Sequence, residues 1–172
     1  NDKVKLNWED SDNFNGEELK KFDGVVIPGG FGYRGIEGKI SAIEYLRKGK
    51  IPFLGICLGL QCAVIEFARN ECGINDANSS EFSQNTNNYV IDLLPNQNLE
   101  KDDIGASMRL GTYPCKIKKG TLTSKIYNDE IIYERHRHRY EVNNKFKDEL
   151  EKAGLVISGM SPDNNLIEMI EV

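Results

Sequence analysis

The arrangement in this sequence with the clearest chemical potential is a cysteine set between two glycines, Gly55-Ile56-Cys57-Leu58-Gly59. An apolar run precedes it and an apolar helical stretch follows it, which is the strand–turn–helix setting of a nucleophile elbow. The turn strains the backbone of the nucleophile, and glycines two residues before and after it prevent collisions. The amino end of the helix favours a thiolate over a thiol. The pattern therefore predicts that Cys57 is a nucleophile.

The competing interpretation is a structural thiol, because free cysteine is among the most frequently buried residue types. The glycine spacing alone does not separate the two interpretations, but the flanking strand and helix favour the nucleophile. In that case the N–H of Leu58 points to where an oxyanion forms. Cys62, Cys72 and Cys115 lack this setting and are interpreted as packing residues.

A second candidate is the glycine-rich segment 28–35 (PGGFGYRG), which follows the apolar run 24–27. Glycines at the carboxyl end of a strand allow a ligand to approach the backbone closely. The spacing matches neither GxGxxG nor a Walker A loop, so it does not favour a nucleotide site. Because Cys57 also follows a strand end, the N–H of Gly30 is a candidate second donor to the oxyanion.

The third candidate is the segment 134–143 (ERHRHRYEVN), which contains the two histidines of the chain. If it is a strand, His136, His138 and Tyr140 share one face and the arginines share the other. One hypothesis is a basic patch for phosphate or nucleic acid, which the net charge of −5 disfavours. The other is a histidine that acts as the base for Cys57.

These candidates must be positioned by alternating strands and helices. Apolar runs at 24–27 and 52–56 are expected to be strands buried on both faces, and apolar periodicity predicts helices at 37–48 and 59–70. This order is typical of an α/β fold with a parallel sheet. The second half is expected to contain strands at 89–94, 108–118, 131–142, 155–160 and 165–172, a helix at 145–153, and polar loops at 71–88 and 95–105.

Composition restricts the classes of function. A chain of 172 residues with 39 % hydrophobic and 28 % charged residues fits one folded domain. Its negative charge argues against nucleic acid as a partner, and its apolar runs are far shorter than the ~20 residues of a membrane span. Scattered cysteines without zinc spacing predict no metal site and a cytoplasmic location. Because it begins without Met and ends at Val172 inside an expected strand, the chain is expected to be a piece of a longer protein.

Five segments together resemble a known family: PGGFGYRGIEGK, KIPFLGICLGLQCAVIEFARN, DANSSEF, MRLGTYPC and YERHRHRYEVNN. They are similar to the glutamine amidotransferase (glutaminase) domains of CTP synthases, which are triad-type (class I) amidotransferases. The segments follow the family order and cover nearly the whole chain. The expected domain is thus 1–172, a glutamine amidotransferase domain incomplete at both ends, with the synthetase domain absent. The expected fold is an α/β three-layer sandwich with a mostly parallel, flavodoxin-like central sheet, the elbow at a strand–helix turn, and an antiparallel strand extension.

The resemblance implies a role for each matching residue. Cys57 would form a γ-glutamyl thioester, and the backbone N–H groups of Gly30 and Leu58 would form the oxyanion hole. Phe31 would lie at the mouth of the pocket, and Arg109 resembles part of a lid linked to an activating effector. The residues implied to bind glutamine are Gly30, Gln61, Glu81, Arg139 and Tyr140.

The implied function is hydrolysis of L-glutamine, which delivers ammonia for the ATP-dependent amination of UTP to CTP in pyrimidine nucleotide biosynthesis. No cofactor or metal is implied for this domain, whereas the full protein would use Mg-ATP and UTP and respond to GTP as an effector. The implied partners are L-glutamine and an N-terminal synthetase domain of the same polypeptide, with neither nucleic acid nor a membrane. The full protein would be a cytoplasmic homotetramer.

The sequence departs from the family pattern in one respect. The catalytic histidine and glutamate of the family lie in an FHPE-type motif that these residues do not contain, so the chain alone is expected to be inactive. His136 and His138 do not match that motif and are interpreted as structural residues that shape the glutamine pocket. Two alternatives remain: a non-hydrolytic glutamine-binding or assembly module, and another triad hydrolase of the same fold, similar to γ-glutamyl hydrolase.

Overall fold

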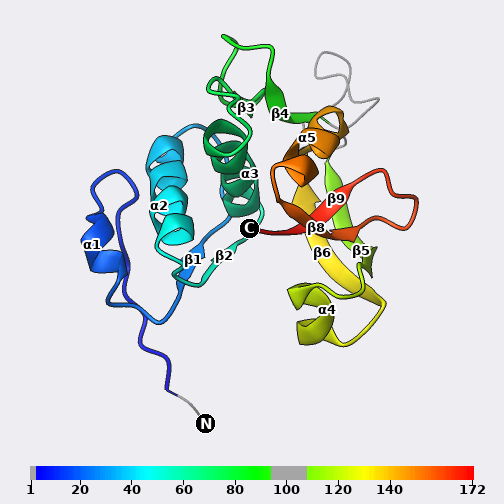
Figure 1. Cartoon of the computed structure of the whole chain (residues 1–172), viewed down its shortest axis with the longest axis horizontal. Coiled ribbons are helices and arrows are strands. Elements are labelled where there is room, and N and C mark those ends of the chain that lie inside the picture. The colour runs from blue at the N-terminus through cyan, green and yellow to red at the C-terminus, as the bar shows by residue number, and fades with distance from the viewer. Residues whose placement is uncertain (1–2, 94–107) are drawn as a thin grey trace.

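Two short apolar strands and the helices that follow them carry the elbow. The computed structural model describes residues 3–93 and 108–172. Strands β1 (Val25–Ile27) and β2 (Phe53–Gly55) pair in parallel. Helix α2 (Ile36–Lys48) follows β1, helix α3 (Leu58–Asn70) follows β2, and the two helices pack along each other (Figure 1).

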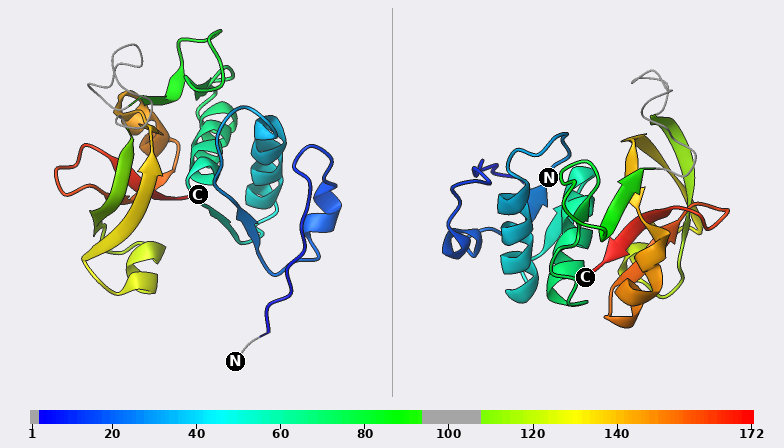
Figure 2. Two further views of the ribbon diagram at one scale, coloured as in Figure 1. Left: turned by 180° about the vertical axis from the view of Figure 1, so that it is seen from behind. Right: turned by 90° about the horizontal axis from the view of Figure 1, so that it is seen from above.

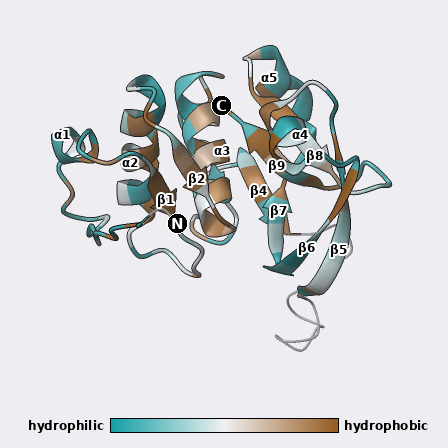
Figure 3. Cartoon of the chain, turned by 90° about the horizontal axis from the view of Figure 1, so that it is seen from below, coloured by the Kyte–Doolittle hydropathy of each residue, from teal (hydrophilic) through white to brown (hydrophobic). Residues whose placement is uncertain are grey.

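The core lies between α2 and α3 and extends towards the strands. Both helices place apolar residues three or four positions apart, which creates one buried stripe on each. Figure 3 shows apolar residues on α3 and on both parallel strands. The fully buried members of this core include Ile43, Leu46, Val64, Ile65 and Ile91.

After α3, the part of the chain that the structure describes forms two further sheets beside this helix (Figure 2). In the first, β3 (Asn78–Ser79) is parallel to β4 (Tyr89–Leu93), and β4 is antiparallel to β7 (Tyr140–Val142). The second is antiparallel with the order β6-β5-β8-β9, formed by β5 (Arg109–Ile117), β6 (Ile131–His138), β8 (Val156–Met160) and β9 (Ile167–Glu171). Short helices complete the fold: α1 (Gly16–Leu19), α4 (Leu122–Tyr127), η1 (Asn144–Phe146) and α5 (Lys147–Lys152).

The α/β class is confirmed, but the strands in residues 3–93 and 108–172 form three sheets, and more of their pairs are antiparallel than parallel. The expectation that 24–27 and 52–56 are buried on both faces is wrong. Val26 is 57 % exposed and Leu54 is 58 % exposed, because α2 and α3 cover only one face of the pair. Of the described residues, none belongs to a helix long and apolar enough to cross a bilayer.

The expected strand 131–142 is interrupted at Arg139. The reason is that β6 pairs with β5 up to His138, whereas β7 pairs with β4, so the chain changes sheets at this point. The 71–88 loop contains the short strand β3, α4 was not predicted, and the predicted loop 95–105 lies outside the described residues.

An ion pair holds α2 against α3. Arg47 donates from Nε and Nη2 to the two carboxylate oxygens of Glu66, both at 2.8 Å, and from Nη1 to Glu71 at 2.6 Å. The Glu66 side chain is fully buried. Removing the partner of such a buried carboxylate lowers the stability of the fold, because the charge then remains unpaired and poorly solvated.

Replacing Arg47 with Met should therefore lower the free energy of unfolding by about 3–5 kcal/mol. The matched control is Lys48→Met, which removes the exposed i,i+4 pair with Glu44 and should cost less than about 1 kcal/mol. Urea denaturation of both variants measures the difference. Equal, small losses would contradict a structural role for the Arg47–Glu66 pair.

Candidate functional site

Cys57 lies between β2 and α3 in a strained backbone conformation, with φ 56° and ψ −108°. Positive φ is unfavourable for a residue with a Cβ atom and is found mainly where surrounding structure enforces it. A Cβ atom at Gly59 would lie 2.1 Å from the carbonyl oxygen of Ile27, and one at Gly55 would lie 2.8 Å from the carbonyl oxygen of Gly59. Both positions therefore require glycine, as the sequence pattern predicts.

The surroundings of Cys57 favour the ionised sulfur. Burial alone raises the pKa of this thiol, but a hydrogen bond with His138 and the positive charge of its ring lower it. The backbone N–H groups of Leu58 and Gly30 also hydrogen-bond to the sulfur, and the net effect is a lowered pKa. By contrast, burial raises the pKa of Cys62 to about 12. Cys57 thus differs from Cys62, a buried thiol in the helix that follows it.

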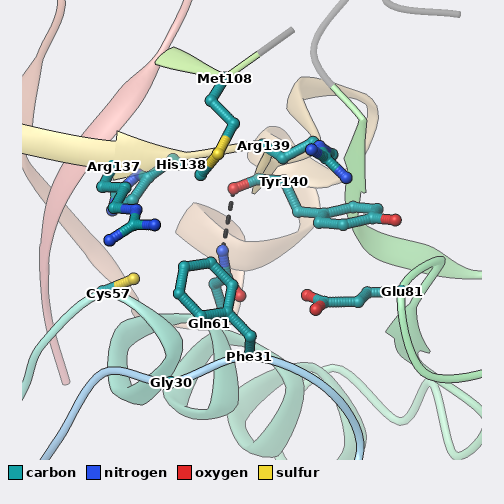
Figure 4. Close-up of a pocket in the computed structure, with 10 residues that line it drawn as sticks. All are labelled: Gly30, Phe31, Cys57, Gln61, Glu81, Met108, Arg137, His138, Arg139 and Tyr140. Atoms are coloured by element: carbon teal, nitrogen blue, oxygen red, sulfur yellow. Dashed lines mark hydrogen bonds between the residues drawn. The ribbon is translucent and has the colours of Figure 1, made fainter. Parts of the chain in front are cut away.

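The Cys57 side chain faces a cavity of about 260 Å³. In Figure 4, Cys57 and Glu81 lie at opposite sides of this pocket, with Phe31 and Gln61 between them. Charged groups at a distance from the sulfur suit a small substrate that has a polar end and a reactive end. The lining residues are Gly30, Phe31, Cys57, Gln61, Glu81, Met108, Arg137, His138, Arg139 and Tyr140.

Hydrogen bonds position two walls of the pocket. Gln61, one helical turn after the cysteine, donates from Nε2 to the carbonyl oxygen of Tyr140 at 2.9 Å (Figure 4). Glu81 accepts at Oε1 from the backbone N–H of Gly32 at 3.0 Å. The backbone N–H of Glu81 donates to Ser79 Oγ at 3.1 Å. The helix thus fixes the β7 side of the pocket, and the glycine-rich loop fixes the Glu81 side.

The structure brings most of the predicted site residues together. All the predicted glutamine-binding residues, as well as Cys57 and Phe31, line the pocket, and Leu58 contributes its backbone N–H. Arg109 does not line it. Its guanidinium is buried in ion pairs with Glu168 at 2.5 Å and Glu141 at 3.4 Å. A role for Arg109 in effector activation stays a prediction.

Three lining residues were not among the predicted site residues: Met108, Arg137 and His138. Strict strand alternation puts Arg137 on the face opposite His138, yet both residues line the pocket, close to the end of β6. His136 is buried and is not among the residues that line the pocket, whereas His138 lines the pocket together with Cys57. The sequence signal for the position of His138 in the pocket was that His136 and His138 are the two histidines of the chain.

No group of three or more His, Cys, Asp or Glu side chains in residues 3–93 and 108–172 is arranged to hold a metal ion. The reactive group that the geometry offers is the Cys57 sulfur. Its strained turn and the N–H donors aimed at it define a class of protein, the α/β proteins that carry a cysteine on a strand–helix elbow.

Comparison with known proteins narrows this class. The chain belongs to the class-I glutamine amidotransferases, because the family model described as "Glutamine amidotransferase class-I" matches residues 2–172. It is 60 % identical over 173 residues to a CTP synthase of Desulfitobacterium hafniense (strain Y51), an alignment that covers 98 % of this chain and 32 % of the relative. It is 53 % identical over 180 residues to a CTP synthase of Methanocaldococcus jannaschii, covering 99 % of this chain and 33 % of the relative.

A solved structure agrees with these sequence relatives. The glutaminase domain of a Trypanosoma brucei CTPS with bound acivicin matches with a TM-score of 0.81 and 40 % identity. The match covers 91 % of this chain and 60 % of that chain. This chain spans about a third of the length of the curated relatives.

The steric argument for the elbow predicts the effect of a single methyl group. In Gly59→Ala the new Cβ would clash with the Ile27 backbone, so the turn must open, at a cost of about 1–3 kcal/mol or more. Thermal denaturation should show this loss, and alkylation of Cys57 at neutral pH should slow. The control is Gly24→Ala, whose Cβ would meet its nearest neighbour at an ordinary 3.5 Å. A Gly59→Ala protein with unchanged stability and reactivity would contradict the argument.

Proposed function

We propose that this chain is the glutaminase part of a CTP synthase, and that the full protein hydrolyses the side-chain amide of L-glutamine at Cys57. The observation that carries the proposal is the orientation of Cys57, whose activated sulfur faces a pocket with charged groups set away from it. The size of the cavity suits one amino acid, and the family membership supports glutamine as the amide donor.

Glutamine would bind with its α-amino acid end away from the sulfur. The carboxylate of Glu81 is suited to the α-ammonium group, and the guanidinium of Arg139 to the α-carboxylate. Gln61 holds the main chain of Tyr140 against the same end of the substrate. Phe31, 63 % exposed, would form the mouth of the pocket. The acivicin bound to the Trypanosoma brucei glutaminase domain supports a site for glutamine-like molecules in this fold.

The chemistry is a two-step acyl transfer. The Cys57 thiolate attacks the amide carbon of glutamine, and the N–H groups of Leu58 and Gly30 stabilise the resulting oxyanion. The carbon–nitrogen bond then breaks, the nitrogen takes up a proton and leaves as ammonia, and a γ-glutamyl thioester remains on Cys57. Water attacks the thioester, gives up a proton, and releases glutamate and the thiolate.

The relatives support a larger assembly around this activity. Ammonia would pass to a synthetase domain that precedes this part of the polypeptide, where ATP with Mg²⁺ drives the amination of UTP to CTP. GTP would act as the effector, and the full protein would be a cytoplasmic homotetramer. In that protein the parallel strands would be part of a three-layer, flavodoxin-like central sheet. The curated relatives, three times as long as this chain, support these proposals.

Replacing Cys57 with Ser in the full-length protein should abolish glutamine-dependent CTP formation, a loss of at least about a thousandfold, because an alkoxide is far harder to form than the thiolate. CTP formation from added ammonia should be unchanged, since it bypasses the thioester. Cys72→Ser is the matched control and should keep both activities. Loss of ammonia-dependent activity in Cys57→Ser would show instead that this position serves folding or domain coupling.

The role of Glu81 makes a separate prediction about binding. Glu81→Gln removes the charge opposite the α-ammonium group while keeping a hydrogen-bond acceptor for Gly32, so KM for glutamine should rise at least about tenfold. Turnover at saturating glutamine should change much less. Asp76→Asn, an exposed acid in the same segment, should leave KM unchanged. Equal KM values for all three proteins would exclude Glu81 from substrate binding.

A further inference from the structure

Three consecutive pocket residues lie where the chain passes from one sheet to another. His138 ends β6, Arg139 forms a bend that belongs to neither strand, and Tyr140 begins β7. All three line the pocket. Gln61 holds this bend through the carbonyl oxygen of Tyr140. A second support for the bend comes from buried charges of the antiparallel sheet.

This second support is a series of ion pairs that begins beside the bend. Glu141 Oε1, on β7, is 3.4 Å from Arg109 Nη1 and 3.3 Å from His138 Nδ1. Arg109 and His138 are directly opposite each other in the pairing of β5 with β6. Glu168, on β9, accepts from Arg109 Nη1 at 3.0 Å and from Nη2 at 2.5 Å. The contacts therefore run from β9 through β5 to both sides of the bend.

Glu168 is the far end of this series and its most deeply buried member. Its side chain is 2 % exposed, whereas those of Arg109 and Glu141 are 7 % and 8 % exposed. Both of its carboxylate oxygens accept from Arg109, and such a two-point pairing fixes orientation as well as distance. Glu168 is not among the residues that line the pocket, so it can act on a bound molecule only through its neighbours.

We propose that Glu168 is a positioning residue for glutamine, which it affects through Arg109 and Glu141 without touching the substrate. The ion pairs fix the bend, and the bend places Arg139 and Tyr140 against the α-amino acid end of glutamine. The proposal rests on the proposed function, which puts that end of the substrate there. Because the elbow sulfur lies on another side of the pocket, the role concerns binding rather than thioester formation.

The alternative is that the Arg109–Glu168 pair serves stability alone. Removing one partner of a buried ion pair is destabilising whatever its role, so a test has to separate binding from stability. Strand β9 offers a matched control in Glu171, which accepts from the backbone N–H groups of Leu122 at 3.1 Å and Thr123 at 2.7 Å. Glu171 thus joins the same strand to α4 instead of to the pocket wall.

The test is labelling of Cys57 by acivicin in the full-length protein, followed by mass spectrometry over a range of acivicin concentrations. The half-saturating concentration reports binding, and the limiting rate reports the chemistry at the sulfur. In Glu168→Gln the half-saturating concentration should rise at least about threefold, while the limiting rate changes less than about twofold. Glu171→Gln should keep both wild-type values. An unchanged half-saturating concentration in Glu168→Gln, or equal increases in both variants, would overturn the proposal.

A double variant makes the result independent of the stability that Glu168→Gln loses. Arg109→Met combined with Glu168→Met replaces the buried pair by apolar side chains, an exchange that is often neutral for stability. Glu141 then loses its contact with Arg109, so the half-saturating concentration should rise as in Glu168→Gln. If urea denaturation shows wild-type stability and acivicin binding is also that of wild type, the pair serves stability alone and the proposal is overturned.

The same labelling separates this proposal from the proposed function. If acivicin does not modify Cys57 in wild type and the full-length protein releases no ammonia from L-glutamine, the glutaminase assignment fails, and the role of Glu168 fails with it. If wild type is labelled and hydrolyses glutamine, but the half-saturating concentration is the same in Glu168→Gln, the glutaminase assignment stands and only the role of Glu168 fails.

Discussion

The site depends on the left-handed backbone of Cys57, and on the absence of side chains that would prevent it. The backbone N–H of Ile56 donates to the carbonyl oxygen of Ile27 at 2.9 Å, which brings the turn against β1. The first turn of α3 then packs so closely on β1 that only a glycine fits at position 59. Because of this approach, the sulfur faces the glycine-rich loop after β1, and the N–H of Gly30 can reach it.

The same turn sets the helical register of the residues that follow. The N–H of Gln61 donates to the carbonyl oxygen of Cys57 at 3.1 Å, so the Gln61 side chain lies one turn along the same side of α3. From there it holds the main chain of Tyr140, on the strand that also carries Glu141. The elbow therefore fixes both the nucleophile and, through one amide, the opposite wall of the pocket.

Buried charges connect the pocket to the antiparallel sheet. His138, Glu141, Arg109 and Glu168 form a continuous series of contacts from the pocket to β9. Isolated buried charges are costly, but each member here has a neighbour of opposite sign or a hydrogen-bond partner. The four-stranded sheet thus contributes to the site by holding one wall of the pocket, although most of its residues lie away from the pocket.

Much of this arrangement could be predicted from the sequence because it depends on local rules. The spacing of Gly55, Cys57 and Gly59 specifies the elbow, and apolar periodicity gives both long helices to within a residue or two. The change of sheets at Arg139 could not be predicted in this way. It depends on pairing with two distant strands, β5 before Arg139 and β4 after it. The ion pair of Arg109 could not be predicted for a similar reason, since its partner Glu168 is 59 residues away.

The exposed face of β1 and β2 was also beyond sequence patterns. Runs such as Gly24–Ile27 are apolar on both faces, and the pattern does not tell which face a neighbouring element covers. Most of the pocket-lining residues, by contrast, were predicted because the segments that contain them resemble those of a known family. The geometry adds to that resemblance the position of His138 in the pocket.

The central claim is that Cys57 forms a thioester with the side chain of glutamine. The most direct measurement is mass spectrometry of the protein after mixing with L-glutamine and rapid acid quenching, with peptide mapping of the product. The account predicts a single γ-glutamyl group, carried by Cys57, that is absent with L-asparagine and in Cys57→Ser. A glutamyl group on another residue, or its absence from Cys57 while glutamine is being hydrolysed, would contradict the account.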